Sequence, residues 1–166
     1  MKKFAPDSAI VPSGIEAKNF RLRILTINDV VKDYDAVMSS ISHLRGVFGP
    51  GSSWPSPDLT LEQDLIDLGW HQKEFQNRTS FAFTVMSLDE SRCLGCVYVY
   101  PAEKRDYDAK VILWVCQSEI DAGLDKKLFS TVRKWLSEKW WFNRVAYPGR
   151  NLSWDEWELL PDKRSV

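Results

Sequence analysis

The hydrophobic pattern of the chain is clearest between residues 111 and 136, where a continuous apolar run precedes a helical repeat. Residues 111–115 read VILWV, which is typical of a strand covered on both faces. After a polar turn, apolar residues recur every three or four positions, at Leu124, Leu128, Val132, Trp135 and Leu136. This spacing predicts an amphipathic helix that packs one face on a sheet.

The turn between this strand and this helix has two interpretations. The first amides of a helix and the positive end of its dipole form a natural seat for a phosphate group. Turns that hold phosphates usually contain several glycines, but this one has only Gly123, with Asp125 two residues later. The segment therefore predicts either a phosphate-binding turn or an ordinary strand-to-helix crossover of an α/β domain.

Two further helices are indicated upstream. Asn28 or Asp29 can cap a helix whose apolar face extends over residues 30–41. Thr60 and Gln63 form a capping-box pattern at the start of a second helix, which has an apolar face of its own.

Strands are predicted by short segments rich in β-branched and aromatic residues. A first strand covers residues 20–25, and two more, 80–87 and 92–100, are separated by the turn LDES. A turn of this length predicts that the two strands pair antiparallel. Residues 142–147 form a last short strand, after which the sheet edge must be covered by the tail or by another chain.

The chain has 166 residues, of which 44% are hydrophobic, which is enough for one domain with a sizeable core. We expect an irregular N-terminal arm over residues 1–19 and a single domain over residues 20–160. Residues 46–58 read GVFGPGSSWPSPD and form a long loop around Trp54. Its length makes it a candidate functional loop.

Composition argues against several partners. The net charge of −1 and a pI near 6.1 provide no general attraction to nucleic acid. Pro6, Asp7 and Pro12 interrupt the apolar run that a signal peptide needs, and no segment is long and apolar enough to span a membrane. We therefore expect a cytoplasmic protein that binds neither nucleic acid nor membrane.

Three cysteines in a cytoplasmic chain do not suggest a disulfide framework, but Cys93 and Cys96 have a spacing seen in metal sites. Both lie on a predicted strand, where positions three apart point to opposite faces. His43 and His71 lie on other predicted elements. We therefore predict that the cysteines are buried core residues and that the chain has no metal site.

The order of a strand, two helices, three antiparallel strands, a helix and a strand resembles the GNAT-type N-acetyltransferases over about residues 20–147. The resemblance implies an α/β fold, of the α+β mixed-sheet kind, in which helices flank a central, mostly antiparallel sheet. In that family a turn of pattern Arg/Gln-x-x-Gly-x-Gly/Ala holds the coenzyme pyrophosphate. Gly123 takes the first glycine position, whereas Ile120 replaces Arg or Gln and Asp125 replaces the last Gly or Ala.

The resemblance also implies a set of residues that bind acetyl-CoA. The backbone of Trp114, Val115 and Cys116 would lie beside pantetheine, and the start of the helix would face the phosphates. A carboxylate at Asp125 would repel those phosphates, although an acid in the first turn also interacts favourably with the helix dipole. The coenzyme-binding residues implied are Trp114, Val115, Cys116, Gly123, Leu124, Asp125 and Lys126.

Catalytic residues are not assigned. The family commonly uses a Glu on the strand before the turn as its base, and Lys110 stands near that position. Glu62, Asp64 and Glu103 are candidate acids near the presumed acceptor side, although residues of this kind are more often solvated charges. Tyr147 is a candidate general acid or, alternatively, a core residue.

Two functions remain open: an acyl-CoA-dependent N-acetyltransferase that acts on a small-molecule or peptide amine, and a GNAT-fold binding module without catalytic activity. Coenzyme binding would separate them. The chain also has eight tryptophans, several of which flank the last strand. They would form core if buried, and a partner surface or homodimer contact if exposed.

Overall fold

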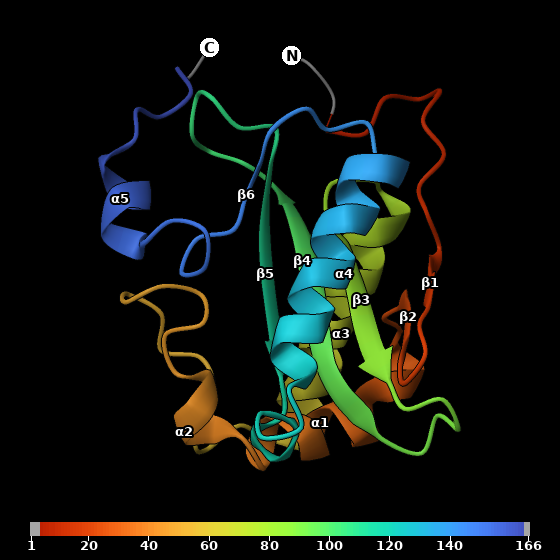
Figure 1. Ribbon diagram of the computed structural model, residues 1–166. Coiled ribbons are helices and arrows are strands. Elements are labelled where there is room, and N and C mark those ends of the chain that lie inside the picture. Colours follow the sequence, from red (N-terminus) through yellow and green to blue (C-terminus); the bar gives the residue numbers. More distant parts are fainter. Residues whose placement is uncertain (1–3, 165–166) are drawn as a thin grey trace.

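A six-stranded sheet in the order β1-β2-β3-β4-β5-β6 runs through the computed structural model, which describes residues 4–164 (Figure 1). Its strands are β1 (Gly14–Glu16), β2 (Arg21–Ile24), β3 (Phe81–Met86), β4 (Cys93–Pro101), β5 (Ala109–Val115) and β6 (Val145–Ala146). The helices are α1 (Val30–Met38), α2 (Ile41–Leu44), α3 (Leu61–Gln76), α4 (Leu124–Lys139) and α5 (Trp154–Leu159), with short 3₁₀ helices at Ile27–Asp29 and Gln117–Glu119.

The pairing confirms the mixed, mostly antiparallel sheet. Strands β1 to β5 pair antiparallel with their neighbours, and the predicted hairpin joins β3 and β4. Only β6 runs parallel to its neighbour, through two residue pairs, Ala109 with Val145 and Lys110 with Ala146. The sheet therefore opens between β5 and β6 immediately after these two pairs.

Helices cover both faces of the sheet (Figure 1). On one face, Leu128 and Val132 of α4 pack on a cluster that includes Val97, Val111 and Leu113. On the other face, the alternate side chains of β4 and β5, such as Ile112, pack with α1, α2 and α3. The unbroken apolar run of β5 is thus explained, because each face of this strand is covered by a helix layer.

Local sequence signals fixed several helix boundaries. Thr60 and Gln63 make both hydrogen bonds of the expected capping box at the start of α3. The first predicted helix is divided, because the chain leaves the helix after Met38 and resumes at Ile41. Within the segment expected to be an irregular arm, Gly14–Glu16 forms the edge strand β1 by pairing with β2.

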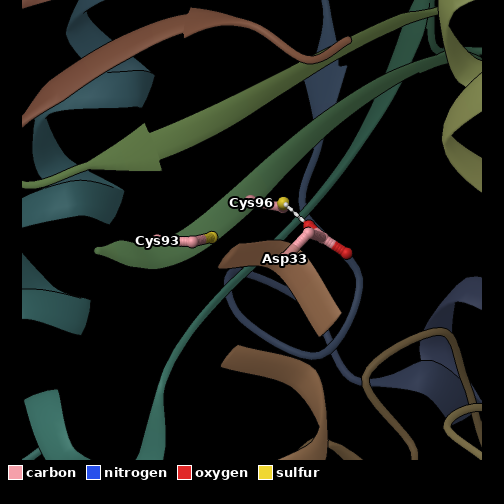
Figure 2. Close-up of side chains that lie close together, drawn as sticks. All are labelled: Asp33, Cys93 and Cys96. Atoms are coloured by element: carbon pink, nitrogen blue, oxygen red, sulfur yellow. Dashed lines mark hydrogen bonds between the residues drawn. The ribbon is translucent and has the colours of Figure 1, made fainter. Parts of the chain in front are cut away.

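The expectation that Cys93 and Cys96 point to opposite faces is wrong. The register of β3 and β4 shifts between Val85 and Met86, which leaves Leu94 as an extra residue on β4. This irregularity reverses the alternation of faces, so that both cysteines lie in the same core cluster. Figure 2 shows them on the same side of β4, together with Asp33 of α1.

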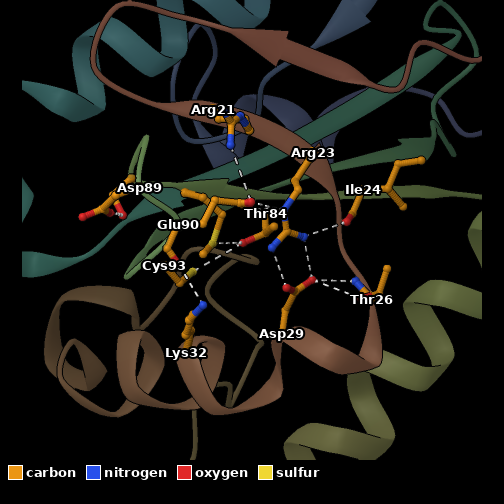
Figure 3. Close-up of polar contacts among 12 residues, drawn as sticks. Arg21, Arg23, Ile24, Thr26, Asp29, Lys32, Thr84, Asp89, Glu90 and Cys93 are labelled. Atoms are coloured by element: carbon orange, nitrogen blue, oxygen red, sulfur yellow. Dashed lines mark hydrogen bonds and ion pairs between the residues drawn. The ribbon is translucent and has the colours of Figure 1, made fainter.

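A buried ion pair ties the start of α1 to the sheet. The Arg23 guanidinium donates two hydrogen bonds to Asp29, at 3.0 and 2.7 Å, and Asp29 also accepts from the Thr26 amide (Figure 3). Arg23 and Lys32 both donate to Glu90 in the turn between β3 and β4. Because Asp29 is only 6% exposed, these bonds compensate the cost of burying its charge.

The segment after β6 packs back on the domain. Trp157 of α5 is 1% exposed and lies in a cluster with Ala102 and Ala146. The chain then follows the loop after β4, where Pro161 O accepts a hydrogen bond from the Arg105 amide. Most tryptophans near the last strand are buried or half-buried, whereas Trp70 on α3 is 59% exposed. Within residues 4–164, no helix combines the length and hydropathy required to cross a bilayer.

Replacing Trp157 with Ala should lower the free energy of unfolding by about 3–5 kcal/mol, because it removes a large buried side chain and leaves a cavity. The exposed Trp70→Ala is the matched control and should cost about 1 kcal/mol or less. Denaturant unfolding of the three proteins measures both values. Equal losses in the two variants would show that the C-terminal segment does not complete the core.

Candidate functional site

The separation of β5 from β6 opens a cleft of about 450 Å³. Because β6 pairs only with Ala109 and Lys110, the rest of that edge of β5 faces the cleft instead of a strand. The opposite wall is the turn that follows β6, at Pro148, Gly149 and Arg150, and the loop after α2 closes one end. The cleft thus exposes strand backbone next to the start of α4.

The start of α4 has unsatisfied hydrogen-bond donors. Gly123 precedes the helix in the left-handed conformation, with φ at 75°, and no side chain caps the helix amides. The surroundings of Gly123 are open, since a Cβ added there would meet nothing within 4 Å. The amides of Leu124, Asp125 and Lys126 thus lie in the first turn of the helix beside the cleft, where an anion would be favoured.

The side chains of the other three predicted coenzyme residues are buried. Trp114, Val115 and Cys116 are at most 3% exposed, so these positions could contact a ligand mainly through their backbone. The Cys116 amide already donates to Leu94 O, at 2.8 Å. Trp114 also lines the cleft.

Arg150 spans the cleft. Its guanidinium donates two hydrogen bonds to the Asp125 carboxylate, at 2.9 and 2.8 Å, and a third to Leu113 O of β5, at 3.1 Å. These bonds hold the pKa of Asp125 below its usual value, although partial burial opposes the shift. Asp125 is therefore ionised and neutralised by Arg150. Sequence reasoning missed Arg150 because no pattern marks its pairing with a residue 25 positions earlier.

A second cavity of about 450 Å³ lies between α1, α3 and β4. Acidic residues of the two helices line it, and aromatic residues of β4 and of the loop at residues 46–58 form the opposite wall. We call this cavity the acidic pocket. Its lining includes Asp33, Trp54, Asp64, Asp67, His71, Glu74, Tyr98 and Tyr100. The predicted functional loop thus lines a cavity.

The acidic pocket and the cleft are neighbours. A smaller cavity shares Phe48 and Tyr100 with the acidic pocket, and shares Ile112 and Trp154 with the cleft. A ligand in the acidic pocket would therefore lie close to a ligand in the cleft. The arrangement suits a reaction between two bound molecules.

Asp33 and Asp64 are both buried in the acidic pocket, each 3% exposed. Burial is the main cause that raises the pKa of Asp33 to about 7 and that of Asp64 to about 8, and the neighbouring Asp33 raises the pKa of Asp64 further. Asp64 Oδ2 and His71 Nδ1 are buried atoms that have no hydrogen-bond partner among the described residues. The sequence had indicated Asp64 as a candidate acid, whereas it had not indicated Asp33 or His71.

The remaining sequence candidates lie elsewhere. Glu62 is exposed on the first turn of α3. Glu103 accepts hydrogen bonds from Lys110 and from Trp157. Tyr147 is 4% exposed and packs against Phe129 in the core, where burial raises its pKa.

Asp33 also forms a group with Cys93 and Cys96, whose ligand atoms all lie within 4.8 Å of one another (Figure 2). The Cys96 thiol donates to Asp33 at 3.3 Å, and the Cys93 thiol donates to Gly95 O at 3.3 Å. Burial raises the pKa of Cys96 well above its usual value. These contacts describe a protonated, hydrogen-bonded thiol, whereas a zinc ligand would be a thiolate.

Comparison with protein-family models gives no match, and comparison with the sequences of curated proteins gives none. Solved structures do match. The ribosomal-protein-S5-alanine acetyltransferase of Vibrio fischeri has a TM-score of 0.60 at 17% identity, over 75% of this chain and 67% of its own. The apo ribosomal L7/L12 alpha-N-protein acetyltransferase has a TM-score of 0.55 at 13% identity, over 80% of this chain and 70% of its own.

The microcin C7 self-immunity acetyltransferase, in complex with acetyl-CoA and AMP, gives a TM-score of 0.53 at 15% identity, over 81% of this chain and 73% of its own. At such low identity these likenesses establish the fold. The fold implied by the resemblance is thereby confirmed.

The raised pKa values predict how stability depends on pH. The folded state holds protons on Asp33 and Asp64 that the unfolded chain, with carboxyl pKa values near 3.8, releases. The free energy of unfolding should therefore fall as pH rises from about 4 to about 8. Asp64→Asn should reduce this fall by about 2 kcal/mol, whereas the exposed Asp35→Asn on α1 should not change it.

Chemical denaturation at a series of pH values measures this effect. Parallel curves for the wild type and Asp64→Asn would contradict the buried carboxyl pair.

A second prediction concerns the group of Asp33, Cys93 and Cys96. Because three ligands fall short of the four of a structural zinc site, and because the thiols already have hydrogen bonds, we expect no stoichiometric zinc in protein purified without added metal. Elemental analysis tests this. Zinc at one equivalent, lost in Cys96→Ser, would overturn the prediction.

Proposed function

Because the chain has the fold of the GNAT N-acetyltransferases, we propose that it is an acyl-CoA-dependent N-acetyltransferase that moves an acetyl group to an amine. The observation that carries this proposal is the cleft between β5 and β6 beside the uncapped start of α4. A free strand edge can bind the amides of pantetheine, and helix amides can bind phosphates. The proposed co-substrate is acetyl-CoA.

In this proposal the predicted coenzyme residues act mainly through their backbone. The edge of β5 around Trp114, Val115 and Cys116 lies along the pantetheine. The amides of Leu124, Asp125 and Lys126, together with the left-handed turn at Gly123, face the pyrophosphate. This assignment agrees with the burial of the first three side chains and with the open surroundings of Gly123.

Arg150 controls access to the proposed coenzyme site. While it donates to Leu113 O, it occupies a backbone acceptor on the strand edge that pantetheine would use. Coenzyme binding therefore requires Arg150 to leave β5, after which its guanidinium is free to pair with a phosphate. Asp125 opposes this step, because its carboxylate holds Arg150 and repels phosphates.

In this proposal the acceptor amine binds in the acidic pocket. An ammonium group must lose a proton before its nitrogen can attack a thioester, and a carboxyl with a pKa near neutrality is suited to accept that proton. The pair formed by Asp33 and Asp64 has such pKa values. We therefore propose this pair as the general base.

The acceptor is a small-molecule or peptide amine, and two of the neighbours cited above are named as acetyltransferases of ribosomal proteins. We place the protein in the cytoplasm, in agreement with three cysteines that are free and buried. A homodimer remains a prediction from the tryptophan content.

Acetyl-CoA should bind the full chain, and Asp125→Asn should bind it about tenfold more tightly, because the change removes a repelling carboxylate and releases Arg150. Isothermal titration calorimetry measures both affinities. Asp121→Asn is the matched control: it removes the same charge from the turn that precedes α4, and Asp121 is exposed. We expect a change of about twofold or less in the control.

Two outcomes would count against the proposal. Equal gains in Asp121→Asn and Asp125→Asn would mean that the bridge to Arg150 does not govern access. If none of the three proteins binds acetyl-CoA, the proposed coenzyme site is wrong. The chain would then be a GNAT-fold binding module without acetyltransferase activity.

A further inference from the structure

Acidic side chains dominate the lining of the acidic pocket. Its lining includes the carboxyl groups of Asp33, Asp64, Asp67 and Glu74, and among residues 4–164 no lysine or arginine lines it. His71 is the one basic residue of the lining, and burial lowers its pKa, which keeps it neutral near pH 7. A ligand that fits this lining must bring positive charge.

One of these carboxyl groups has an oxygen atom without a hydrogen-bond partner in the part of the chain that the structure describes. Asp64 is 3% exposed, and its Oδ2 atom has no hydrogen bond among the described residues. The neighbouring Nδ1 of His71 is also buried and unpaired there. An unpaired buried acceptor is costly, and an N–H donor from a ligand in the pocket would satisfy it.

The negative charge is spread along a line. Asp64, Asp67, His71 and Glu74 follow one another on α3 at intervals of three or four residues, so they share one face of the helix. At 1.5 Å per residue, the acidic stripe from Asp64 to Glu74 extends about 15 Å. The pocket is therefore longer than a single ammonium group requires.

The wall opposite this stripe is aromatic. Tyr98 and Tyr100 of β4 stack with ring centroids 6.0 Å apart, and Trp54 of the loop packs on Trp114. Aromatic faces attract ammonium groups and also cover methylene chains. A carboxylate stripe facing an aromatic wall fits a chain in which ammonium groups alternate with methylene segments.

A metal ion fits this pocket less well. Among the described residues, the one group of acids, cysteines and histidines with ligand atoms within 4.8 Å of one another is Asp33 with the two cysteines. The carboxylates of Asp64, Asp67 and Glu74 are therefore too dispersed to surround one ion. Glu74 is moreover already bonded to the Ser80 hydroxyl, at 2.6 Å.

We propose that the acidic pocket binds a linear aliphatic polyamine, with its ammonium groups on the carboxylates of α3 and its methylenes on the aromatic wall. The polyamine binds whether or not acetyl-CoA is present, whereas its role as the acetyl acceptor rests on the proposed function. The smaller cavity between the pocket and the cleft places one end of such a chain near the coenzyme.

Calorimetry on the full chain without acetyl-CoA tests the binding, with spermidine as probe. We expect one site, with an affinity for spermidine at least about tenfold higher than for butylamine, which carries a single ammonium group. Asp67→Asn and Asp64→Asn should each weaken spermidine binding about fivefold or more. Asp35→Asn removes the same charge from the exposed side of α1 and should leave the affinity unchanged.

The outcomes separate the two proposals. Spermidine binding that is no tighter than butylamine binding, or that Asp64→Asn and Asp67→Asn do not weaken, would overturn the polyamine pocket. Competition by Mg²⁺ beyond that of an equal ionic strength of Na⁺ would also overturn it, in favour of a metal site. Failure of acetyl-CoA to bind would overturn the acetyltransferase and leave the polyamine pocket standing.

If both ligands bind, mass spectrometry after incubation with acetyl-CoA should detect acetylated spermidine. Binding of both without this product would contradict the role of the polyamine as acceptor.

Discussion

The parting of β5 and β6 after two residue pairs is the constraint on which the rest of the structure depends. It leaves one edge of a central strand without a strand partner, and an exposed edge must be covered or satisfied in another way. Here a side chain does so, because Arg150 donates to Leu113 O. The same parting sends the chain outward after Ala146 into the segment that buries Trp157, so that the cleft and the C-terminal closure of the core have one origin.

The bridge between Arg150 and Asp125 crosses the cleft. A bidentate arginine–carboxylate pair is specific in geometry, and its partial burial reduces screening by water. The Arg150 guanidinium also lies 5.2 Å from the ring centroid of Phe129, which adds a cation–π contact. A ligand that takes the place of this bridge must therefore offer Arg150 another anion, and the phosphates of a coenzyme would do so.

The acidic pocket is unfavourable for stability, because two buried carboxyls share it and one of their oxygen atoms has no hydrogen-bond partner within residues 4–164. Elsewhere the fold satisfies a buried charge fully, as Arg23 does for Asp29. Asp29 is thus fully paired, whereas the pair of Asp33 and Asp64 is not. Groups with perturbed pKa values and missing hydrogen bonds are typical of binding and catalytic sites, where the ligand completes the set of contacts.

The sequence by itself determined the local elements: the capping box of α3, the apolar stripe of α4, the hairpin of β3 and β4, and the buried run of β5, since each depends on residues within a few positions. It also indicated the turn at Gly123 as a candidate phosphate-binding turn, and it indicated the long loop. Only the tertiary structure decided that a register shift places Cys93 beside Cys96, that Arg150 meets Asp125, and that Asp33 faces Asp64. These contacts depend on strand register and helix packing across tens of residues, which periodicity within a single element does not encode.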